Sequence, residues 1–176
     1  MKDALIIFLM CVAAIVVGAL LFFSAPTSLT GTDEPANGEP TETPTIVTEV
    51  SFVELDEGVG ADVTERKNYA ARDEDAYERL WEMAHGEDGK PMPEVDFSKE
   101  YVIAAFSGER PSGGHAVAVE KVVDADGVRT VHAALTAPGD GCVVTDAITS
   151  PFVFITVPES VNALEAVDAT RIEPCT

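Results

Sequence analysis

The stretch YVIAAFSGERPSGGHAVAVEKVV, residues 101–123, predicts two β-strands joined by a glycine-rich loop. Residues 101–106 form a short, strongly apolar run, and residues 115–123 show the period of two that is typical of strands. The loop at 108–115 contains two adjacent glycines and a proline, which favour turns. This stretch therefore indicates a β-rich domain.

Further strands are predicted on both sides of this stretch. They are short runs of apolar residues separated by Gly, Pro and Asp. Asp126-Gly127 is typical of a tight hairpin turn, and Asp56-Glu57-Gly58 is a turn signal that ends the first strand. The predicted strands occupy residues 46–55, 115–123, 128–135 and 152–157, with weaker candidates at 143–148 and 167–172.

One helix is predicted at Arg72–Ala84. Apolar side chains recur on one face of this segment, and three acidic residues near its start favour a helix N-terminus. The pair His85-Gly86 predicts its end. Several short strands with one helix near the start indicate an α+β, mostly β domain whose sheet curls into a small sandwich or a half-barrel. The apolar face consists of Ala76, Tyr77, Leu80, Trp81 and Ala84.

The N-terminal residues predict a membrane anchor. Residues 4–23 form a run of 20 residues without a charged side chain, and a helix of that length spans about 30 Å, the thickness of the hydrocarbon core. A cleaved signal peptide is the competing interpretation, but Pro26 makes the preceding small residues a poor cleavage site. Lys2 precedes the run and Arg66 is the first basic residue after it, so the positive-inside rule places the N-terminus in the cytoplasm. We therefore expect a single-pass protein of the cell membrane with its C-terminal part outside.

The chain is expected to consist of three parts. Residues 1–23 contain the transmembrane signal anchor, residues 24–45 predict a disordered linker rich in Thr, Pro and acids, and residues 46–176 form an extracytoplasmic domain. The formal charge of the chain is −20, which excludes nucleic acids as partners because binding them depends on neutralising phosphates with Lys and Arg. Such acidity is typical of a protein that stays soluble in salty surroundings, as in a halophile, and a cationic partner is the alternative.

Two of the three cysteines are expected to form a disulfide. Cys142 and Cys175 both fall in the exported part, where oxidising conditions favour pairing, and the bond would hold the C-terminus in place. Two unrelated thiols are the alternative. Cys11 lies inside the apolar run and is interpreted as an inert membrane thiol.

No complete catalytic or metal-binding arrangement is recognisable in the sequence. The three histidines have no further ligand at a metal-binding spacing. Ser112 lies in a turn that lacks the first glycine of a nucleophile elbow. Residues 124–127 resemble the start of a calcium loop, but Leu135 occupies the twelfth position, which needs Glu. We therefore expect a protein that is not an enzyme and that binds no metal or cofactor.

The glycine-rich loop is the most informative candidate for a binding site. Binding residues concentrate in loops on rigid sheets, and Arg110 offers a planar cation on an acidic protein. An ordinary hairpin loop is the alternative. The candidate interaction loop comprises Gly108, Glu109, Arg110, Pro111, Ser112, Gly113, Gly114 and His115, and a candidate second turn comprises Thr149, Ser150, Pro151 and Phe152.

Several of these segments together resemble the PrcB C-terminal domain family, over residues 70–160. The family is named for a subunit of a cell-surface protease complex, so the resemblance implies a non-catalytic accessory protein that binds or stabilises a protein partner, such as a surface protease. Two features differ from the family pattern: His115 stands where an aromatic residue such as Tyr is expected, and a helical anchor replaces a lipid-modified N-terminus. The resembling segments are Asp96-Phe97-Ser98, the strand at 101–106, the block at 108–115, and Thr149-Ser150-Pro151-Phe152 before a strand that ends in Val157-Pro158.

The sequence thus predicts a membrane-anchored, non-catalytic extracytoplasmic interaction module, with the loop at 108–115 and the turn at 149–152 as its contact surface. Two alternatives stay open. Residues 111–115 are similar to the Pro-Thr-Thr-Gly-aromatic loop of chagasin-type cysteine-protease inhibitors, which implies an inhibitor-like module. The other alternative is a structural envelope protein without a discrete partner, in which the loop is only a turn.

Overall fold

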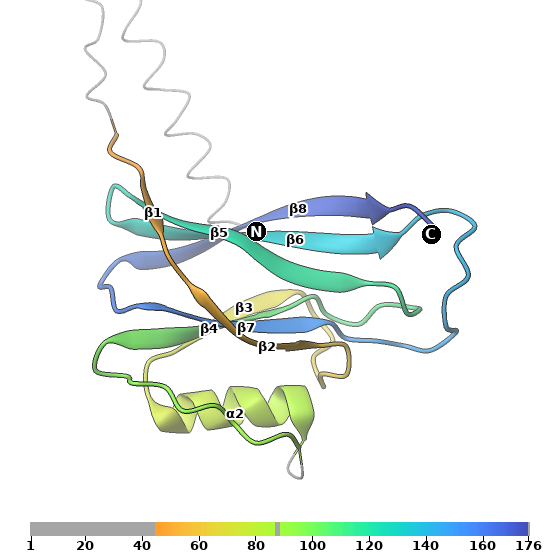
Figure 1. The fold of residues 1–176 in the computed structure, drawn as a ribbon, viewed down its shortest axis with the longest axis horizontal. Coiled ribbons are helices and arrows are strands. Elements are labelled where there is room, and N and C mark those ends of the chain that lie inside the picture. Colours follow the sequence, from red (N-terminus) through yellow and green to blue (C-terminus); the bar gives the residue numbers. More distant parts are fainter. Residues whose placement is uncertain (1–44, 87–88, 176) are drawn as a thin grey trace, which may run out of the picture. The chain divides into compact units, whose positions relative to one another are not determined.

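The computed structural model describes residues 45–86 and 89–175, which form two four-stranded sheets packed face to face and one helix (Figure 1). The outer sheet has the strand order β1-β5-β6-β8, and the central sheet, which lies between the outer sheet and the helix, has the order β2-β7-β4-β3. The elements are β1 (Thr48–Val50), β2 (Val53–Gly58), β3 (Lys67–Ala71), α2 (Glu74–His85), β4 (Glu100–Phe106), β5 (Ala116–Ala125), β6 (Val128–Pro138), β7 (Phe152–Pro158) and β8 (Ala163–Glu173).

Strands β4 and β7 form the middle of the central sheet and are buried on both faces. Successive side chains of a strand point to opposite faces, so Ile103 and Ile155 pack against the outer sheet, whereas Ala104 and Phe154 pack against the helix. Burial on both faces explains why the sequence of each strand is a continuous apolar run rather than an alternating one.

Helix α2 covers the outer surface of the central sheet. The Asp73 carboxylate accepts a hydrogen bond from the Ala76 N–H at 2.8 Å, and Gly86, with φ of +73°, ends the helix. The apolar face predicted from the sequence is the one that is buried, with Trp81 against Phe154 at a ring separation of 5.3 Å. The predicted helix is therefore confirmed, with its first turn starting two residues later.

The outer sheet combines an antiparallel hairpin with a parallel strand. Asp126 and Gly127 connect β5 to β6 with φ values of +50° and +78°, as a tight hairpin turn requires, so this predicted turn is confirmed. Strand β8 pairs with β6 in parallel and without a register shift, from Ala163 to Glu173. The weak strand pattern at 167–172 therefore lies within β8, which has 11 residues and is as long as β6.

A buried arginine links the two sheets at the hairpin end. The Arg129 guanidinium donates two hydrogen bonds of 2.8 Å to the Asp124 carboxylate and one to the Pro158 carbonyl oxygen at the end of β7. These hydrogen bonds hold the pKa of Asp124 below its usual range and raise the pKa of Arg129. Because Arg129 is only 3% exposed, the carboxylate is needed to balance a charge that water does not reach.

Three predictions of local structure were wrong. The segment predicted as one strand at 46–55 crosses from the outer sheet (β1) to the central sheet (β2), and β2 continues through the predicted turn at 56–58. Residues 143–148 form a loop rather than a strand, and β3 was not predicted. The two sheets form an open sandwich and do not close, so of the two predicted architectures the sandwich is the one observed.

The predicted anchor at 1–23, Cys11 and all but the last residue of the predicted linker at 24–45 lie outside the described residues. Within residues 45–86 and 89–175, no helix is both long and apolar enough to cross a membrane.

Candidate functional site

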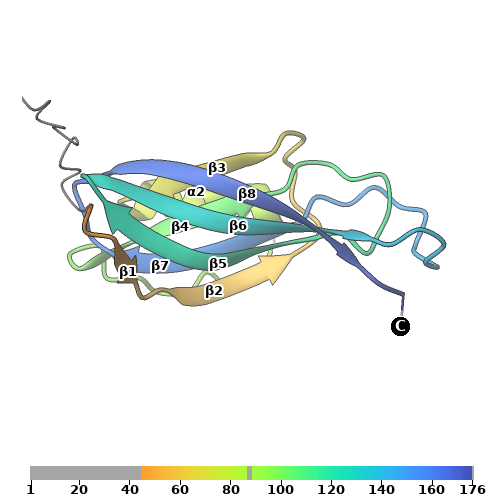
Figure 2. The same ribbon diagram turned by 90° about the horizontal axis from the view of Figure 1, so that it is seen from above.

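The glycine-rich loop and the segment that precedes β7 lie side by side at one end of the sandwich (Figures 1 and 2). The main chains of Arg110 and Thr149 exchange two hydrogen bonds, of 2.7 and 3.0 Å, and the Gly113 N–H donates to the Thr145 carbonyl oxygen at 3.0 Å. The Thr149 hydroxyl donates to the carbonyl oxygen of Ser112 at 2.9 Å. We call the two segments, residues 108–115 and 139–149, the loop end.

Gly108 seats the start of the loop on the connection between β2 and β3. Its φ is +76°, and a Cβ atom placed on it would lie 2.7 to 2.8 Å from main-chain atoms of Thr64, Glu65 and Arg66. The neighbouring Glu109 N–H donates to the Thr64 carbonyl oxygen at 3.1 Å. Only glycine meets both requirements, a left-handed conformation and a close main-chain approach.

The two adjacent glycines have different roles. Gly114 has φ of +79°, whereas Gly113 does not lie in the left-handed region. Gly113 instead approaches the Thr145 side chain so closely that a Cβ atom would collide with the hydroxyl oxygen. The loop therefore needs Gly114 for its conformation and Gly113 for its contact with the other half of the loop end.

Arg110 is half-buried, and its side chain folds back onto the end of β4. Its Nε donates to the Ser107 hydroxyl at 3.0 Å, and its Nη2 donates to the Ser107 carbonyl oxygen at 2.7 Å. Among the residues that the structure describes, no acidic side chain forms a salt bridge with Arg110. A guanidinium has five N–H donors, so donors beyond these two hydrogen bonds remain for a partner.

The candidate second turn supports the loop from beneath. Ser150, Pro151 and Phe152 are buried, and the Ser150 hydroxyl donates to the Val63 carbonyl oxygen at 2.7 Å. Phe152 packs against the helix residue His85 at a ring separation of 5.1 Å. Of this turn, only Thr149 lies close enough to the surface to belong to a contact face.

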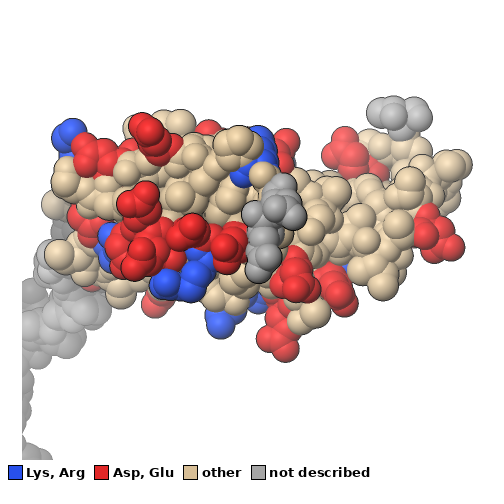
Figure 3. All heavy atoms as spheres, turned by 90° about the horizontal axis from the view of Figure 1, so that it is seen from below, with Lys and Arg blue, Asp and Glu red and all other residues tan. Residues whose placement is uncertain are grey.

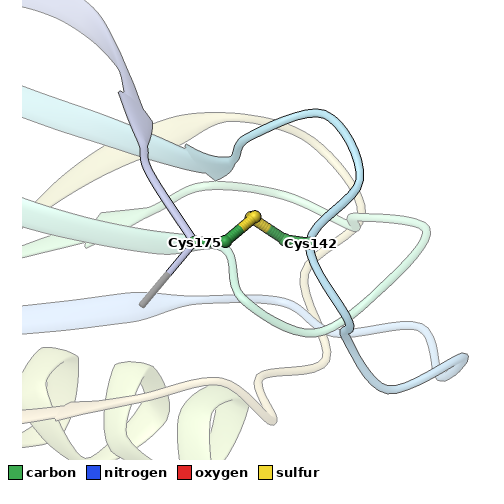
Figure 4. Close-up of a disulfide and its surroundings, with 2 residues drawn as sticks. All are labelled: Cys142 and Cys175. Atoms are coloured by element: carbon green, nitrogen blue, oxygen red, sulfur yellow. A yellow bond between two sulfur atoms is a disulfide. The ribbon is translucent and has the colours of Figure 1, made fainter.

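The predicted disulfide between Cys142 and Cys175 is present, and it joins the loop end to the end of β8 (Figure 4). The main chain nearby is also fixed, because the Gly139 N–H donates to the Glu173 carbonyl oxygen at 2.8 Å. The longer segment of the loop end is therefore held at Gly139 and Cys142 by β8 and at Thr145 and Thr149 by the glycine-rich loop.

Apolar side chains are exposed on this fixed segment. Val143 is 102% exposed and Ile148 is 72% exposed, and Val144 lies between them against Gly114. Figure 3 shows that the end of the molecule formed by the loops, at the right, is mainly uncharged on the face in view, whereas acidic side chains crowd much of the remaining face. We call the exposed side chains of Val143, Val144 and Ile148 the apolar patch; they belong to the end of the molecule that carries few charges on this face.

Sequence reasoning missed this patch because it interpreted residues 143–148 as a weak strand, in which apolar side chains would be buried. One signal was available: Val143 and Val144 directly follow Gly141 and Cys142, in a segment that does not alternate regularly between apolar and polar residues.

A second group of side chains that the sequence did not predict surrounds Asp56 on β2. Its buried carboxylate contacts the Lys90 ammonium and lies 2.9 Å from Nε2 of His85. Burial, with the charge of Asp56 as a smaller cause, raises the pKa of the Tyr77 hydroxyl, so this phenol stays neutral. The Trp81 indole N–H donates to the Lys90 carbonyl oxygen at 2.7 Å. Through these contacts of Lys90, the side chains around Asp56 attach the chain after α2 to the central sheet.

The described residues contain no group of three His, Cys, Asp or Glu side chains placed to hold a metal ion. The histidines lie on separate elements, at the end of α2, before β5 and on β6. The Ser112 hydroxyl donates to the Gly113 carbonyl oxygen at 3.1 Å, as expected of a serine in a turn.

The family model described as PrcB C-terminal matches residues 101–158. The resemblance predicted from the sequence is therefore confirmed, over a shorter stretch than the predicted 70–160. The matched residues run from β4 to the end of β7 and include both segments of the loop end. No curated protein and no solved structure matches this chain.

Proposed function

We propose that this chain is a non-catalytic interaction module, held outside the cytoplasm by the anchor at residues 4–23, and that its loop end binds a protein partner of the surface-protease class. The observation that carries the proposal is the exposure of Val143 and Ile148 on a segment that a disulfide and several hydrogen bonds hold in place.

An exposed apolar patch of this kind suits a protein partner. Burying a Val or Ile side chain is worth about 1.5 to 3 kcal/mol, and the centre of a protein interface is depleted of charged residues. Asp140 and Asp146 lie exposed on the same segment, so the surface offers charged groups beside the apolar ones, as protein interfaces do.

The rigidity of the loop end favours binding. A flexible loop loses conformational freedom when a partner orders it, and that loss reduces affinity. Here Gly108 is seated on main-chain atoms, Arg110 pairs with Thr149, and Cys142 is bonded to Cys175, so most of this cost is met when the domain folds.

The protease class rests on the family match. The family is related to a protease complex, and the matched residues contain the whole of the loop end. An accessory domain of such a complex needs a contact surface and no catalytic group of its own. Of the side chains at the loop end, the Arg110 guanidinium is of the kind most often found to anchor an interface.

Photo-crosslinking in intact membranes tests the proposal. A photoreactive amino acid replaces Val143 in one preparation, Ile148 in a second and Val161 in a third. Val161 is the matched control, because it is also 102% exposed but lies at the opposite end of the sandwich, between β7 and β8.

Positions 143 and 148 should give the same crosslinked protein, identified by mass spectrometry as a protease or a subunit of one, and position 161 should not give it. Identical products at all three positions would contradict a specific site at the loop end. A specific product without a protease would refute the assigned class of partner but keep the site. Loss of the protease's activity on binding would favour the inhibitor-like alternative.

A further inference from the structure

Besides the loop end, the unpaired edge of β8 is a second surface suited to binding a partner. Strand β8 ends the outer sheet and pairs only with β6. The Ala163 N–H donates to Gly127 and the Glu173 carbonyl oxygen accepts from Gly139, so odd-numbered residues direct their main-chain groups towards β6. The groups of the even-numbered residues from 164 to 172 therefore point away from the sheet, because these directions alternate along a strand.

This edge lacks several of the devices that prevent edge strands from pairing. Natural proteins shorten their edge strands, interrupt them with bulges and prolines, or place charged side chains on them. Of these devices β8 has only the charges, at Glu165, Asp168, Arg171 and Glu173. Strand β8 has 11 residues, keeps one register with β6 along its whole length and contains no proline. All of its residues except Leu164 are exposed. In the part of the chain that the structure describes, its outward main-chain groups have no strand to pair with.

The order of side chains on β8 indicates which strand would pair with this edge. We infer that two copies of this chain pair through β8 in antiparallel fashion, around a two-fold axis at Asp168. In this register an acid faces a base and apolar or small residues face one another. The opposed pairs are Leu164 with Ile172, Glu165 with Arg171, Ala166 with Thr170, and Val167 with Ala169.

The register also agrees with the directions of the main-chain groups. Residues 164, 166, 168, 170 and 172 of one copy face residues of the same set in the other copy, so every outward N–H and C=O obtains a partner. The two outer sheets would join into one continuous sheet. A strand from a different protein would satisfy the same main-chain groups, but it would not explain why the side chains of β8 complement their own reversed order.

One pair in this register brings two like charges together, because Asp168 meets Asp168 of the second copy. Each of these carboxylates already accepts two hydrogen bonds from its own Arg66, of 2.9 and 2.5 Å. Arg66 comes from the connection before β3, which lies along the same side of the sandwich as β8 (Figure 2). The same guanidinium donates to the Phe106 carbonyl oxygen at 3.1 Å, so it is held in place before any pairing. The two acids would therefore meet as two neutralised ion pairs.

Disulfide trapping with the full chain in detergent tests the register. Every preparation carries Cys11→Ser, so the introduced thiol is the only free one. One preparation carries Val167→Cys and another Ala169→Cys. In the inferred dimer, residue 167 of one copy faces residue 169 of the other. Residue 167 of one copy is offset by about two residues from residue 167 of the other, and the same holds for residue 169. Mild oxidation of the mixture should give a covalent dimer on a non-reducing gel, and each preparation alone should give little. Equal yields in all three samples would overturn the inference.

A charge exchange, followed by sedimentation of the full chain, tests the affinity. Arg171→Glu places two acids opposite each other at both ends of the dimer and should weaken it at least about tenfold. Adding Glu165→Arg restores the opposite charges and should restore the dimer. Arg171 also pairs with Glu120 in its own copy, but the double variant does not restore that pair. Recovery of the dimer therefore reports on pairing at the β8 edge alone.

The control is Lys121→Glu, which makes the same charge change on β5, away from the edge, and should leave the dimer intact. A wild-type chain that sediments as a monomer at about 0.1 mM, a range in which weak edge pairings are detected, would overturn the inference. Failure of the double variant to recover, with its thermal unfolding unchanged, would overturn it as well.

Discussion

Replacing Gly108 with alanine should lower the free energy of unfolding by about 2 to 5 kcal/mol. The left-handed conformation at φ of +76° costs an alanine about 1 to 2 kcal/mol. The new methyl group would also lie 2.7 to 2.8 Å from three main-chain atoms of residues 64–66, which cannot rotate away, and overpacking of this kind costs about 1 to 3 kcal/mol.

Gly127→Ala separates these two contributions. Gly127 has φ of +78°, but no atom lies within 4 Å of the position that its Cβ would take. This variant should therefore lose only the conformational part, about 1 to 2 kcal/mol. Urea unfolding monitored by the fluorescence of the single tryptophan, Trp81, measures both variants, because its ring is buried between α2 and the central sheet.

The difference between the two variants is the informative quantity. A loss at Gly108 at least about 1 kcal/mol larger than that at Gly127 would support a loop seated on the connection before β3. Equal losses would show that this connection yields to the methyl group and that the loop end is not rigid.

Three further predictions concern the disulfide, one ion pair and the topology. Replacing Cys142 and Cys175 with serine should lower the free energy of unfolding by up to about 4 kcal/mol, the chain-entropy value for a separation of 33 residues, and no measurable loss would contradict the structure. The hydrogen bonds from Arg129 lower the pKa of Asp124, so this pair stabilises the domain above about pH 4 and the stabilisation is lost as the pH falls through the lowered pKa. The melting temperatures of wild type and Asp124→Asn should therefore differ most at pH 7 and converge towards pH 2, and a constant difference would contradict this account. Protease added to intact cells should release the domain by cutting within residues 24–45, whereas protection until lysis would reverse the proposed topology.

The parts of the fold that were predictable are those with strong local signals. Strands β4 and β7 are continuous apolar runs because both faces are buried, and α2 has one apolar face because it covers a single sheet. The hairpin at Asp126 and Gly127 was predictable because the turn requires left-handed conformations that these residues tolerate. In each case the local sequence alone contains the reason for the structure.

The parts that were not predictable depend on residues distant in the sequence. Asp56 was interpreted as a turn residue, yet it lies inside β2, where its buried carboxylate contacts the Lys90 ammonium and lies 2.9 Å from Nε2 of His85. Strand β3 is short, polar and at the edge of the central sheet, so it has little pattern of its own. These elements follow from tertiary contacts that no short window of sequence contains.

The candidate site was predictable in the same uneven way. Glycine and proline marked the loop at 108–115, since these residues favour turns wherever they occur. The exposure of Val143 and Ile148 was not predictable, because it depends on how the disulfide and the bridge at Thr149 hold the other segment. The sequence indicated one half of the loop end, and only the structure shows the apolar half.

The affinity of the crosslinked partner for two serine variants tests most directly the claim that the loop end binds a protein. Val143→Ser together with Ile148→Ser should weaken binding by about 2 to 4 kcal/mol, or about 30-fold to 1,000-fold, if both side chains become buried. Both are exposed in the free domain, so the urea unfolding of this variant should match that of wild type. The control Val161→Ser, equally exposed at the other end, should bind as wild type does. Equal dissociation constants for all three proteins would contradict the claim.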